Sequence, residues 1–410
     1  MKNICLCFQI HHPFHYRTYR FLDIDKSHDY YDNRRIKKEI TEAALHSYLP
    51  TNEFLLNLIA LSGGKLKLLF DISGCAIDQF MMYSPEVIRS FRKLAETGKV
   101  GFTGGTRSHS IASMVNHSKE FKKQIVENRE LINNYFGQKP QIFSNSNFIF
   151  SNSICDQISE TGYDSVLING SKNILDWRSP NYLYDSQGEM SISIFFRNED
   201  ISNKLSSILK YSGQLNIKKQ LRQLIGSLDA FDTEEPQVFV YCNYLDFGRS
   251  NIETKQLFFH QFVNELMSND VFQFNLPAEM QELYGPIAEI GSENPVCWHE
   301  QFSDSYYPCN ELQKEAIKEL FKLEKKMNKI TSYDLQRDWL YLQTTDHFHL
   351  MDENHPNYQT ELSGENIFKS KYDAFINYRN ILEDFKQRIN SEISNKNKRE
   401  KNKSELEIGS

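Results

Sequence analysis

The sequence predicts an α/β protein in which an incomplete (β/α)7, TIM-like barrel is followed by a C-terminal helical domain. Seven short β-type runs occupy roughly the first 245 residues, helix-like stretches separate most of them, and the pattern becomes helical from about residue 310. Strands that alternate with helices favour parallel βαβ units. A chain of 410 residues also has room for a barrel of roughly 250–300 residues and an attached domain.

The strands expected in the barrel are all short and are separated by turns or helical patterns. They are Lys2–Ile10, Lys65–Ser73, Lys99–Thr103, Gln141–Ser146, Ser165–Ile168, Ser191–Arg197 and Gln237–Asn243. Among the intervening segments, Ser84–Thr97 has Pro85 in a position suited to a first helical turn. Ser118–Tyr135 repeats apolar residues near a period of 3.6. Because parallel barrels carry their chemistry at the C-terminal ends of the strands, we expect the site there.

The C-terminal region is predicted to be helical and then to lose regular structure. Helical patterns cover Glu311–Asn328, Ser332–Gln343 and Tyr372–Ile389. The last residues are rich in Lys, Asn, Ser and Glu, a composition that cannot bury an apolar face. We therefore predict a barrel domain over 1–290, a helical domain over 291–390 and a disordered tail over 391–410.

Composition excludes several classes of function. The formal net charge is −7 and no basic face stands out, so nucleic-acid binding is not expected. The chain has no run of about 18 apolar residues, and its N-terminus looks like a first strand, so neither a membrane span nor a signal peptide is expected. The seven cysteines are scattered, which predicts free thiols in a cytoplasmic protein. Cys5 and Cys7 have no matching second pair, so we expect no metal and no cofactor.

Several motifs occur in a fixed order along the chain. They are Phe8–Phe14, Phe21–Ile24, Tyr48–Pro50, Ile72–Phe80, Ser108–Ser110, Trp177–Tyr184 and Leu342–Phe348. Together they resemble the α-amylase-like branch of glycoside hydrolase family 57, from residue 4 to about residue 385. The resemblance implies a role in carbohydrate metabolism, with an α-glucan or a maltooligosaccharide as ligand.

The two residues that the resemblance assigns to catalysis are both amides. Asn147 stands where the family has its nucleophilic Glu, and Asn243 stands where it has its acid/base Asp. A retaining glycosidase needs two carboxyl groups about 5–5.5 Å apart, one to attack the anomeric carbon and one to move protons. An amide does neither near neutral pH, so the resemblance implies a family member that binds glycan or regulates but does not hydrolyse.

Other departures from the family pattern also remove acids near strand ends. Gly105 stands where relatives have Glu, Asn169 replaces a further Glu and Asn203 replaces an Asp. The Glu-His pair that usually follows Phe-Gly is Arg249-Ser250 here. Random substitution of surface residues would not be concentrated at the ends of strands.

The remaining site residues carried over from the resemblance would bind sugar. These substrate-binding candidates are His11, His109, Trp177, Trp298, Asp346 and His347. Histidine and aspartate can hydrogen-bond sugar hydroxyls, and an indole can stack on a pyranose face. For each of them, a structural role in the core or at an interface is the competing interpretation.

Three alternatives stay open. The protein could be an active retaining α-glucan hydrolase or glucanotransferase that uses relocated carboxylates; the candidates are Asp246, Asp71, Asp78, Glu300, Asp304 and Asp346. It could act as a protein-interaction module through its helical domain. For the non-hydrolytic barrel, a partner amylase is a possible ligand besides the glycan. A metal-dependent deacetylase is disfavoured because His109 is followed by Ser113, and not by a second His, at the fourth position.

Overall fold

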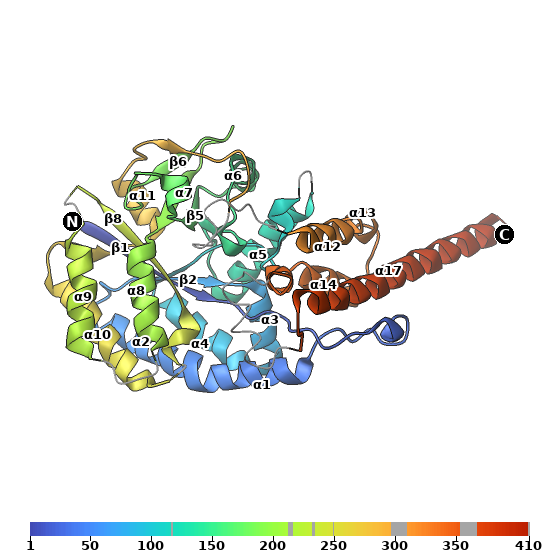
Figure 1. Ribbon diagram of the computed structural model, residues 1–410, viewed down its shortest axis with the longest axis horizontal. Coiled ribbons are helices and arrows are strands. Elements are labelled where there is room, and N and C mark those ends of the chain that lie inside the picture. Colours follow the sequence, from blue (N-terminus) through green and yellow to red (C-terminus); the bar gives the residue numbers. More distant parts are fainter. Residues whose placement is uncertain are drawn as a thin grey trace. The chain divides into compact units, whose positions relative to one another are not determined.

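The computed structural model describes residues 1–115, 118–211, 216–231, 234–248, 250–296, 310–352 and 367–408. The chain divides into two compact units, each made of three segments (Figure 1). The first unit contains Met1–His12, Ile36–Arg107 and Phe121–Tyr307, and the second contains Pro13–Arg35, Ser108–Glu120 and Pro308–Ser410. The pattern predicted one boundary near residue 290, whereas the second unit also takes in two segments from the N-terminal part of the chain.

The first unit is an incomplete (β/α)7 barrel. Its parallel strands are β1 (Lys2–Ile10), β2 (Leu68–Ile72), β3 (Val100–Phe102), β4 (Ile142–Ser144), β5 (Ser165–Asn169), β7 (Ser193–Arg197) and β8 (Gln237–Asn243). They pair in the order β3-β2-β1-β8-β7-β5-β4. A parallel bridge between Gly104 and Phe143 joins the two ends of this row. All seven predicted strands are therefore confirmed.

Three further short strands lie beside the barrel. β6 (Tyr184–Ser186) pairs antiparallel with β7, and β10 (Glu289–Ile290) pairs with β6. β9 (Phe272–Phe274) runs parallel to the start of β1. Segments of two or three residues are too short to show a period of two, so the sequence pattern did not reveal them.

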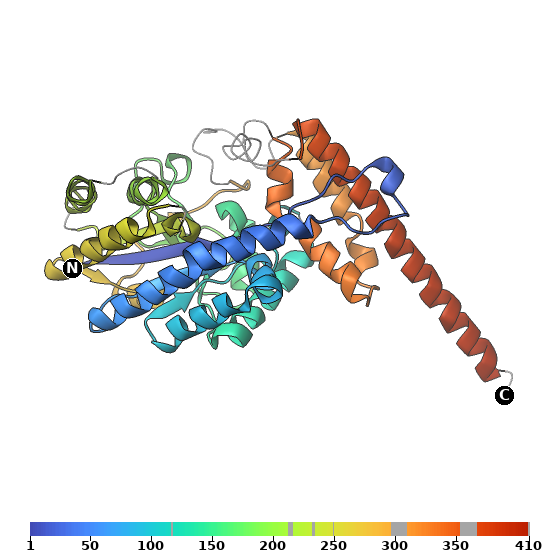
Figure 2. The same ribbon diagram turned by 90° about the horizontal axis from the view of Figure 1, so that it is seen from below.

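Helices cover the outside of the barrel (Figures 1 and 2). They are α1 (Asn33–Ala43), α2 (Leu49–Leu61), α3 (Gly74–Tyr83), α4 (Pro85–Glu96), α5 (Glu120–Phe136), α6 (Asn152–Ser159), α7 (Lys172–Leu175), α8 (Glu199–Lys210), α9 (Ile217–Asp229), α10 (Ile252–Ser268) and α11 (Pro277–Leu283). Helix α4 illustrates how the sequence specifies them. Pro85 occupies its first turn, and Val87, Phe91 and Leu94 are buried at helical spacing.

The barrel has an apolar interior and an aromatic outer layer. Alternate strand residues, together with residues from the loops and from α11, fill the interior: Cys5, Cys7, Leu69, Ile142, Phe148, Leu167, Leu183, Phe195, Phe239, Tyr241 and Met280. On the opposite face of β1, the Phe8 ring packs against Tyr244, Phe247 and Phe259. Removing such a buried ring typically costs about 3–5 kcal/mol of unfolding free energy, so both layers hold the strand ends in place.

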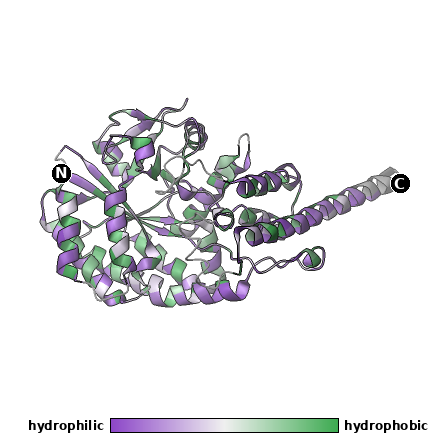
Figure 3. Cartoon of the chain, in the orientation of Figure 1, coloured by the Kyte–Doolittle hydropathy of each residue, from purple (hydrophilic) through white to green (hydrophobic). Residues whose placement is uncertain are grey.

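The second unit contains α12 (Glu311–Phe321), α13 (Glu324–Met327), α14 (Tyr333–Leu342), α15 (Thr345–His349) and α17 (Lys371–Ile408). The three predicted C-terminal helical segments are thus helical. Figure 3 shows that α17 is hydrophilic along most of its length. Among the α17 residues whose burial the structure describes, the buried ones, such as Tyr378, Phe385 and Ile389, lie in the half that begins at Lys371. The structure continues α17 through Ile408, whereas we expected residues 391–410 to be disordered; the Lys and Glu content of this segment favours a helix once α17 has been nucleated.

Residues 13–32 form an extended arm along α17 within the second unit. It includes the short 3-10 turn η1 (Phe21–Asp23). The Tyr19 backbone N–H donates to Asn377 Oδ1 over 2.6 Å, and the Asn380 side-chain amide donates to the Tyr19 carbonyl. Further along the arm, the Tyr30 hydroxyl and the Asp25 backbone N–H both donate to the buried Asp384 carboxylate.

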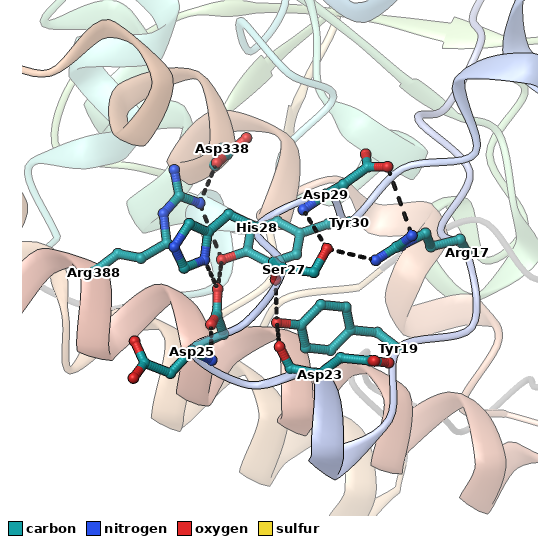
Figure 4. Close-up of polar contacts among 11 residues, drawn as sticks. Arg17, Tyr19, Asp23, Asp25, Ser27, His28, Asp29, Tyr30, Asp338 and Arg388 are labelled. Carbon is teal, nitrogen blue, oxygen red and sulfur yellow. Dashed lines mark hydrogen bonds and ion pairs between the residues drawn. The ribbon is translucent and has the colours of Figure 1, made fainter.

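Two more side chains, His28 and Arg388, complete this polar cluster (Figure 4). His28 Nδ1 lies 2.9 Å from Asp384 Oδ2. Arg388 donates to the Tyr30 hydroxyl over 3.0 Å and to Asp338 Oδ2 over 2.7 Å. Each buried carboxylate therefore has charged or hydrogen-bonding partners, as burial requires. In the described part of the chain, no helix has both the length and the apolar character needed to cross a membrane.

Candidate functional site at the strand ends of the barrel

The last residues of three neighbouring strands form a polar row. In the strand register, Gln9 of β1 pairs with Asp71 of β2 on one side and with Asn243 of β8 on the other. On each strand, the residue two positions earlier belongs to the core inside the barrel. Because side chains alternate along a strand, Gln9, Asp71 and Asn243 lie on the inner face at the C-terminal end.

Asp71 is the carboxyl group of this row. The Tyr241 hydroxyl donates to Asp71 Oδ2 over 2.6 Å, which joins β2 to β8 across the barrel. Burial raises the pKa of the Asp71 carboxyl above its usual value, and the nearby Tyr241 and Ser144 hydroxyls oppose that shift by favouring the ionised form. A raised pKa at a strand end is a feature of functional sites, although structural networks also produce it.

Asn147 lies just beyond β4 in the one-turn helix η4 (Ser146–Phe148). Its backbone is left-handed, with φ 53° and ψ 24°. The Asn145 side chain fixes this turn because its Oδ1 accepts from the Ser146 N–H over 3.0 Å and its Nδ2 donates to the Ile149 carbonyl over 2.8 Å. Asparagine tolerates left-handed backbone better than most residues, so the turn conformation itself favours Asn at position 147.

The turn that contains Asn147 is packed against β8. Phe148 belongs to the core inside the barrel, and its ring centroid lies 4.8 Å from that of Tyr241. Tyr241 precedes Asn243 by two residues on the same face of β8. The loop after β4 and the end of β8 are therefore connected through one aromatic pair.

Asn243 ends β8 and begins the short helix η5 (Tyr244–Phe247). Its Oδ1 accepts from the Leu245 backbone N–H over 2.9 Å, so it acts as the N-cap. Asp246, the nearest relocated-acid candidate, is completely buried, and Lys255 Nζ donates to its backbone carbonyl over 2.8 Å. A carboxylate enclosed in this way is not exposed to a glycan in this conformation.

Asn169 and Asn203, where the resemblance implies acids, converge on one buried arginine. Arg197, at the end of β7, donates through Nη1 to Asn169 Oδ1 over 3.0 Å and through Nη2 to Asn203 Oδ1. Asn169 in turn donates to the Glu199 carboxylate. At the end of β3, the Gly105 backbone N–H donates to the Asn128 side chain. In this network the two amide oxygens both accept hydrogen bonds from the Arg197 guanidinium.

Two predicted sugar-binding residues belong to the first unit. His11 follows β1, and its Nδ1 lies 2.8 Å from Ser73 Oγ, which fixes the orientation of the ring. Trp177 lies on the loop after β5 and α7 and is 83% exposed, with the Arg178 guanidinium 5.4 Å from its ring centroid. An indole this exposed contributes little to the core, which favours the stacking interpretation over the structural one.

Three other predicted residues belong to the second unit. His109 Nδ1 lies 2.8 Å from Thr345 Oγ1 and 3.9 Å from Asp346 Oδ2. His347 is only 3% exposed. Its ring stacks on Tyr16 with centroids 3.8 Å apart, and its Nε2 lies 3.0 Å from the Tyr341 carbonyl. This environment is that of a packed core histidine, whereas His109 and Asp346 are both partly exposed.

The remaining acidic candidates are either paired or outside the described residues. Asp78 accepts two hydrogen bonds of 2.8 Å from Arg107, a geometry typical of a structural ion pair. Trp298, Glu300 and Asp304 lie outside the residues that the structure describes.

Sequence reasoning missed Tyr241 and Arg197. Tyr241 has a recognisable signal, because it precedes Asn243 by two residues and must share its face of the strand. Arg197 ends a strand that is otherwise apolar, which also marks it. Only the fold shows that its guanidinium joins Asn169 to Asn203.

Comparison with known proteins gives the family. The family description "Glycosyl hydrolase family 57" matches residues 5–293. A protein of Methanocaldococcus jannaschii named "Putative alpha-amylase" is 26% identical over 402 residues, which cover 92% of this chain and 84% of that protein.

Solved structures agree on the fold. A family 57 branching enzyme from Thermococcus kodakaraensis superposes with a TM-score of 0.67 at 12% identity, covering 93% of this chain and 89% of that one. An alpha-amylase from Thermotoga maritima superposes with a TM-score of 0.60 at 10% identity, covering 93% of this chain and 99% of that one. The family match spans the whole set of barrel strands described above, and the chain therefore belongs to glycosyl hydrolase family 57.

Proposed function

We propose that this family 57 barrel acts in α-glucan metabolism by binding an α-glucan or a maltooligosaccharide without hydrolysing it. The observation that carries the proposal is that Asn147 follows β4 and Asn243 ends β8, where the family resemblance calls for two carboxyl groups. Neither amide can form a glycosyl ester or transfer a proton near neutral pH. Both can donate to and accept from sugar hydroxyls.

Three observations support this reading. The Asn243 amide oxygen is used as a helix cap, Asp246 is buried, and Asn169 and Asn203 serve a buried guanidinium. The class of ligand is supported by the names of the relatives, which include an alpha-amylase and a branching enzyme. The free, buried thiols of Cys5, Cys7 and Cys155 support a reducing, cytoplasmic compartment.

Each unit has its own residues proposed to contact a sugar. Trp177 would stack on a pyranose face and His11 would hydrogen-bond a hydroxyl in the first unit. In the second unit, His109 and Asp346 offer a donor and an acceptor. His347 would act indirectly, because its ring stacks on Tyr16 and so holds the Tyr16 segment of the second unit in place.

Calorimetry with maltoheptaose and a reducing-end assay on the same preparation test the proposal. We expect saturable binding and no release of reducing ends above the background of the buffer. The variant Trp177→Ala should weaken binding, whereas Tyr333→Ala, which removes an aromatic side chain of similar exposure from α14, should not. Release of reducing ends by the unmodified protein would contradict the proposal.

A second candidate is a hydrolase that uses Asp71. The position of Asp71 on the inner face, in register with Gln9 and Asn243, favours it, as does its raised pKa. Under this alternative, Asp71→Asn would lower the rate of reducing-end release by about 10²-fold or more. Under our proposal, both proteins give the same background rate.

A further inference from the structure

We propose that the N-terminal end of the barrel contains a binding pocket for a sugar phosphate. A cavity of about 430 Å³ lies where β1, β2, β3 and β9 begin. Three lysines line it, Lys65, Lys67 and Lys99, together with the polar residues Asn269 and Asp270. Its volume falls within the range of about 300–1,000 Å³ that is usual for small-molecule sites.

The chain places the three ammonium groups by its turns and strands. Lys67 directly precedes β2, and Lys99 directly precedes β3. Gly63 and Gly64 form the turn before Lys65, with φ values of 60° and 74° that L side chains rarely adopt. A Cβ at Gly64 would lie 2.8 Å from Lys99 Cε, so glycine leaves room for the Lys99 side chain.

Two of the three lysines are available to an anion. Lys67 forms an ion pair with Glu279 and donates to Asn275 Oδ1 over 3.2 Å, so its charge is already balanced. Among the described residues, the Lys65 and Lys99 ammonium groups have no acidic or hydrogen-bonding partner. Two neighbouring ammonium groups on flexible stems suit a phosphate, which carries about two negative charges and accepts several hydrogen bonds.

The rest of the lining suits a polyol. Asp270 is a carboxylate, which would oppose a ligand that is anionic throughout but can accept from sugar hydroxyls. Asn269 and Gln273 supply amides that both donate and accept, while Met267 and Phe272 form an apolar wall. This combination of a cationic end, a hydroxyl-binding side and an apolar face fits a hexose monophosphate better than a free phosphate ion.

The pocket is separate from the proposed glycan site. It lies at the start of the strands, whereas Asn147 and Asn243 lie at or just beyond strand ends, and both sets of residues belong to the first unit. A failure to bind a sugar phosphate would therefore leave the proposed maltooligosaccharide site untouched, and a failure to bind a maltooligosaccharide would leave the sugar-phosphate pocket untouched.

Isothermal calorimetry on the full chain tests the pocket, with glucose 6-phosphate, inorganic phosphate and glucose as probes. We expect glucose 6-phosphate to bind, inorganic phosphate to bind more weakly, and glucose not to bind at this site. The double variant Lys65→Gln/Lys99→Gln should weaken glucose 6-phosphate by about tenfold or more, and added salt should weaken it in the unmodified protein. Thermal unfolding should be unchanged because Lys65 is exposed and Lys99 is half-buried.

A matched control removes two exposed helical lysines elsewhere in the first unit, Lys37→Gln/Lys93→Gln, and should bind as the unmodified protein does. The single variant Asn269→Leu should weaken the binding of glucose 6-phosphate but leave the affinity for inorganic phosphate unchanged. Equal affinity in both lysine double variants would overturn the site. So would the absence of glucose 6-phosphate binding at about 10 mM. Equal affinity for glucose 6-phosphate and inorganic phosphate would overturn the sugar part of the proposal.

Discussion

The strand ends of the barrel and the polar cluster of the second unit differ in their acidic residues. In the second unit, Asp384 and Asp338 are almost fully buried and remain carboxylates, with His28, Tyr30 and Arg388 as partners. At the strand ends, the resemblance calls for carboxylates at several positions and the chain has amides. The contrast indicates that this protein can support buried acids where they hold structure, so a general intolerance of buried acids does not explain the amides at the strand ends.

The two regions also differ in what their polar groups do. In the second unit, the carboxylates fasten an arm to a helix. At the strand ends, Asn243 caps a helix and Asn169 and Asn203 accept from Arg197. The amides therefore have local structural tasks that do not require charge.

The largest effect on stability is expected in the second unit. Asp384→Ala would leave the Tyr30 hydroxyl and the Asp25 N–H without their acceptor, at a cost of about 3 kcal/mol in the free energy of unfolding. Chemical denaturation measures this loss. The control Asp373→Ala removes an exposed acid from the same helix and should change stability by less than about 0.5 kcal/mol. A loss as small for Asp384 as for Asp373 would remove the contrast between the two regions.

A smaller loss is expected at the strand ends. Arg197→Met would leave the Asn169 and Asn203 oxygens without their shared donor, at about 2 kcal/mol. Arg222→Met, on the exposed face of α9, is the matched control and should be close to neutral. If Arg197→Met proved neutral as well, the amides would have no structural task there.

Asp71 should give a pH-dependent difference. Burial raises its folded-state pKa above the unfolded value of about 3.9, so the folded protein binds more protons between the two values. Its contribution to stability is therefore full at low pH and declines as the pH rises through the folded-state pKa. The variant Asp71→Asn lacks this titrating group. The melting temperature of the variant minus that of the unmodified protein should therefore increase as the pH rises from about 4 to 7.

If the two melting temperatures differed by the same amount at every pH in this range, the raised pKa of a buried Asp71 would be contradicted. The control Asp229→Asn changes an exposed acid on α9 and should track the unmodified protein at every pH.

The smallest effect on stability is expected at Trp177. Because its side chain is 83% exposed, Trp177→Ala should change the free energy of unfolding by less than about 0.5 kcal/mol. A large loss would show that the indole is structural and would remove it from the proposed glycan surface.

The sequence predicted the barrel better than the division into units. Strands such as β1 and β8 are long apolar runs that could be recognised from the sequence, and all seven barrel strands were predicted. The second unit takes in Pro13–Arg35 and Ser108–Glu120, which no local pattern could assign to a C-terminal helical region. Those assignments depend on contacts such as that between Tyr19 and Asn377, which are more than 350 residues apart in the chain.

The strands next to the proposed site were predictable, but the local geometry was not. The sequence pattern predicted Asn147 just beyond one strand and Asn243 at the end of another, and the structure has them after β4 and at the end of β8. The left-handed backbone of Asn147 and the shared guanidinium of Arg197 arise from tertiary packing and have no local signature. The His347 ring likewise matched the family motif, whereas its burial against Tyr16 is visible only in the fold.

The most direct measurement is the rate of reducing-end release from maltoheptaose by the double variant Asn147→Glu/Asn243→Asp. Aspartate at position 243 can retain the N-cap, while glutamate at position 147 must adopt a left-handed backbone at a cost of about 1–2 kcal/mol, so thermal unfolding is recorded alongside. We predict no release by the unmodified protein and measurable release by the double variant, with Asn147→Gln/Asn243→Gln inactive as the matched control. Equal release by the unmodified protein and the double variant would contradict it.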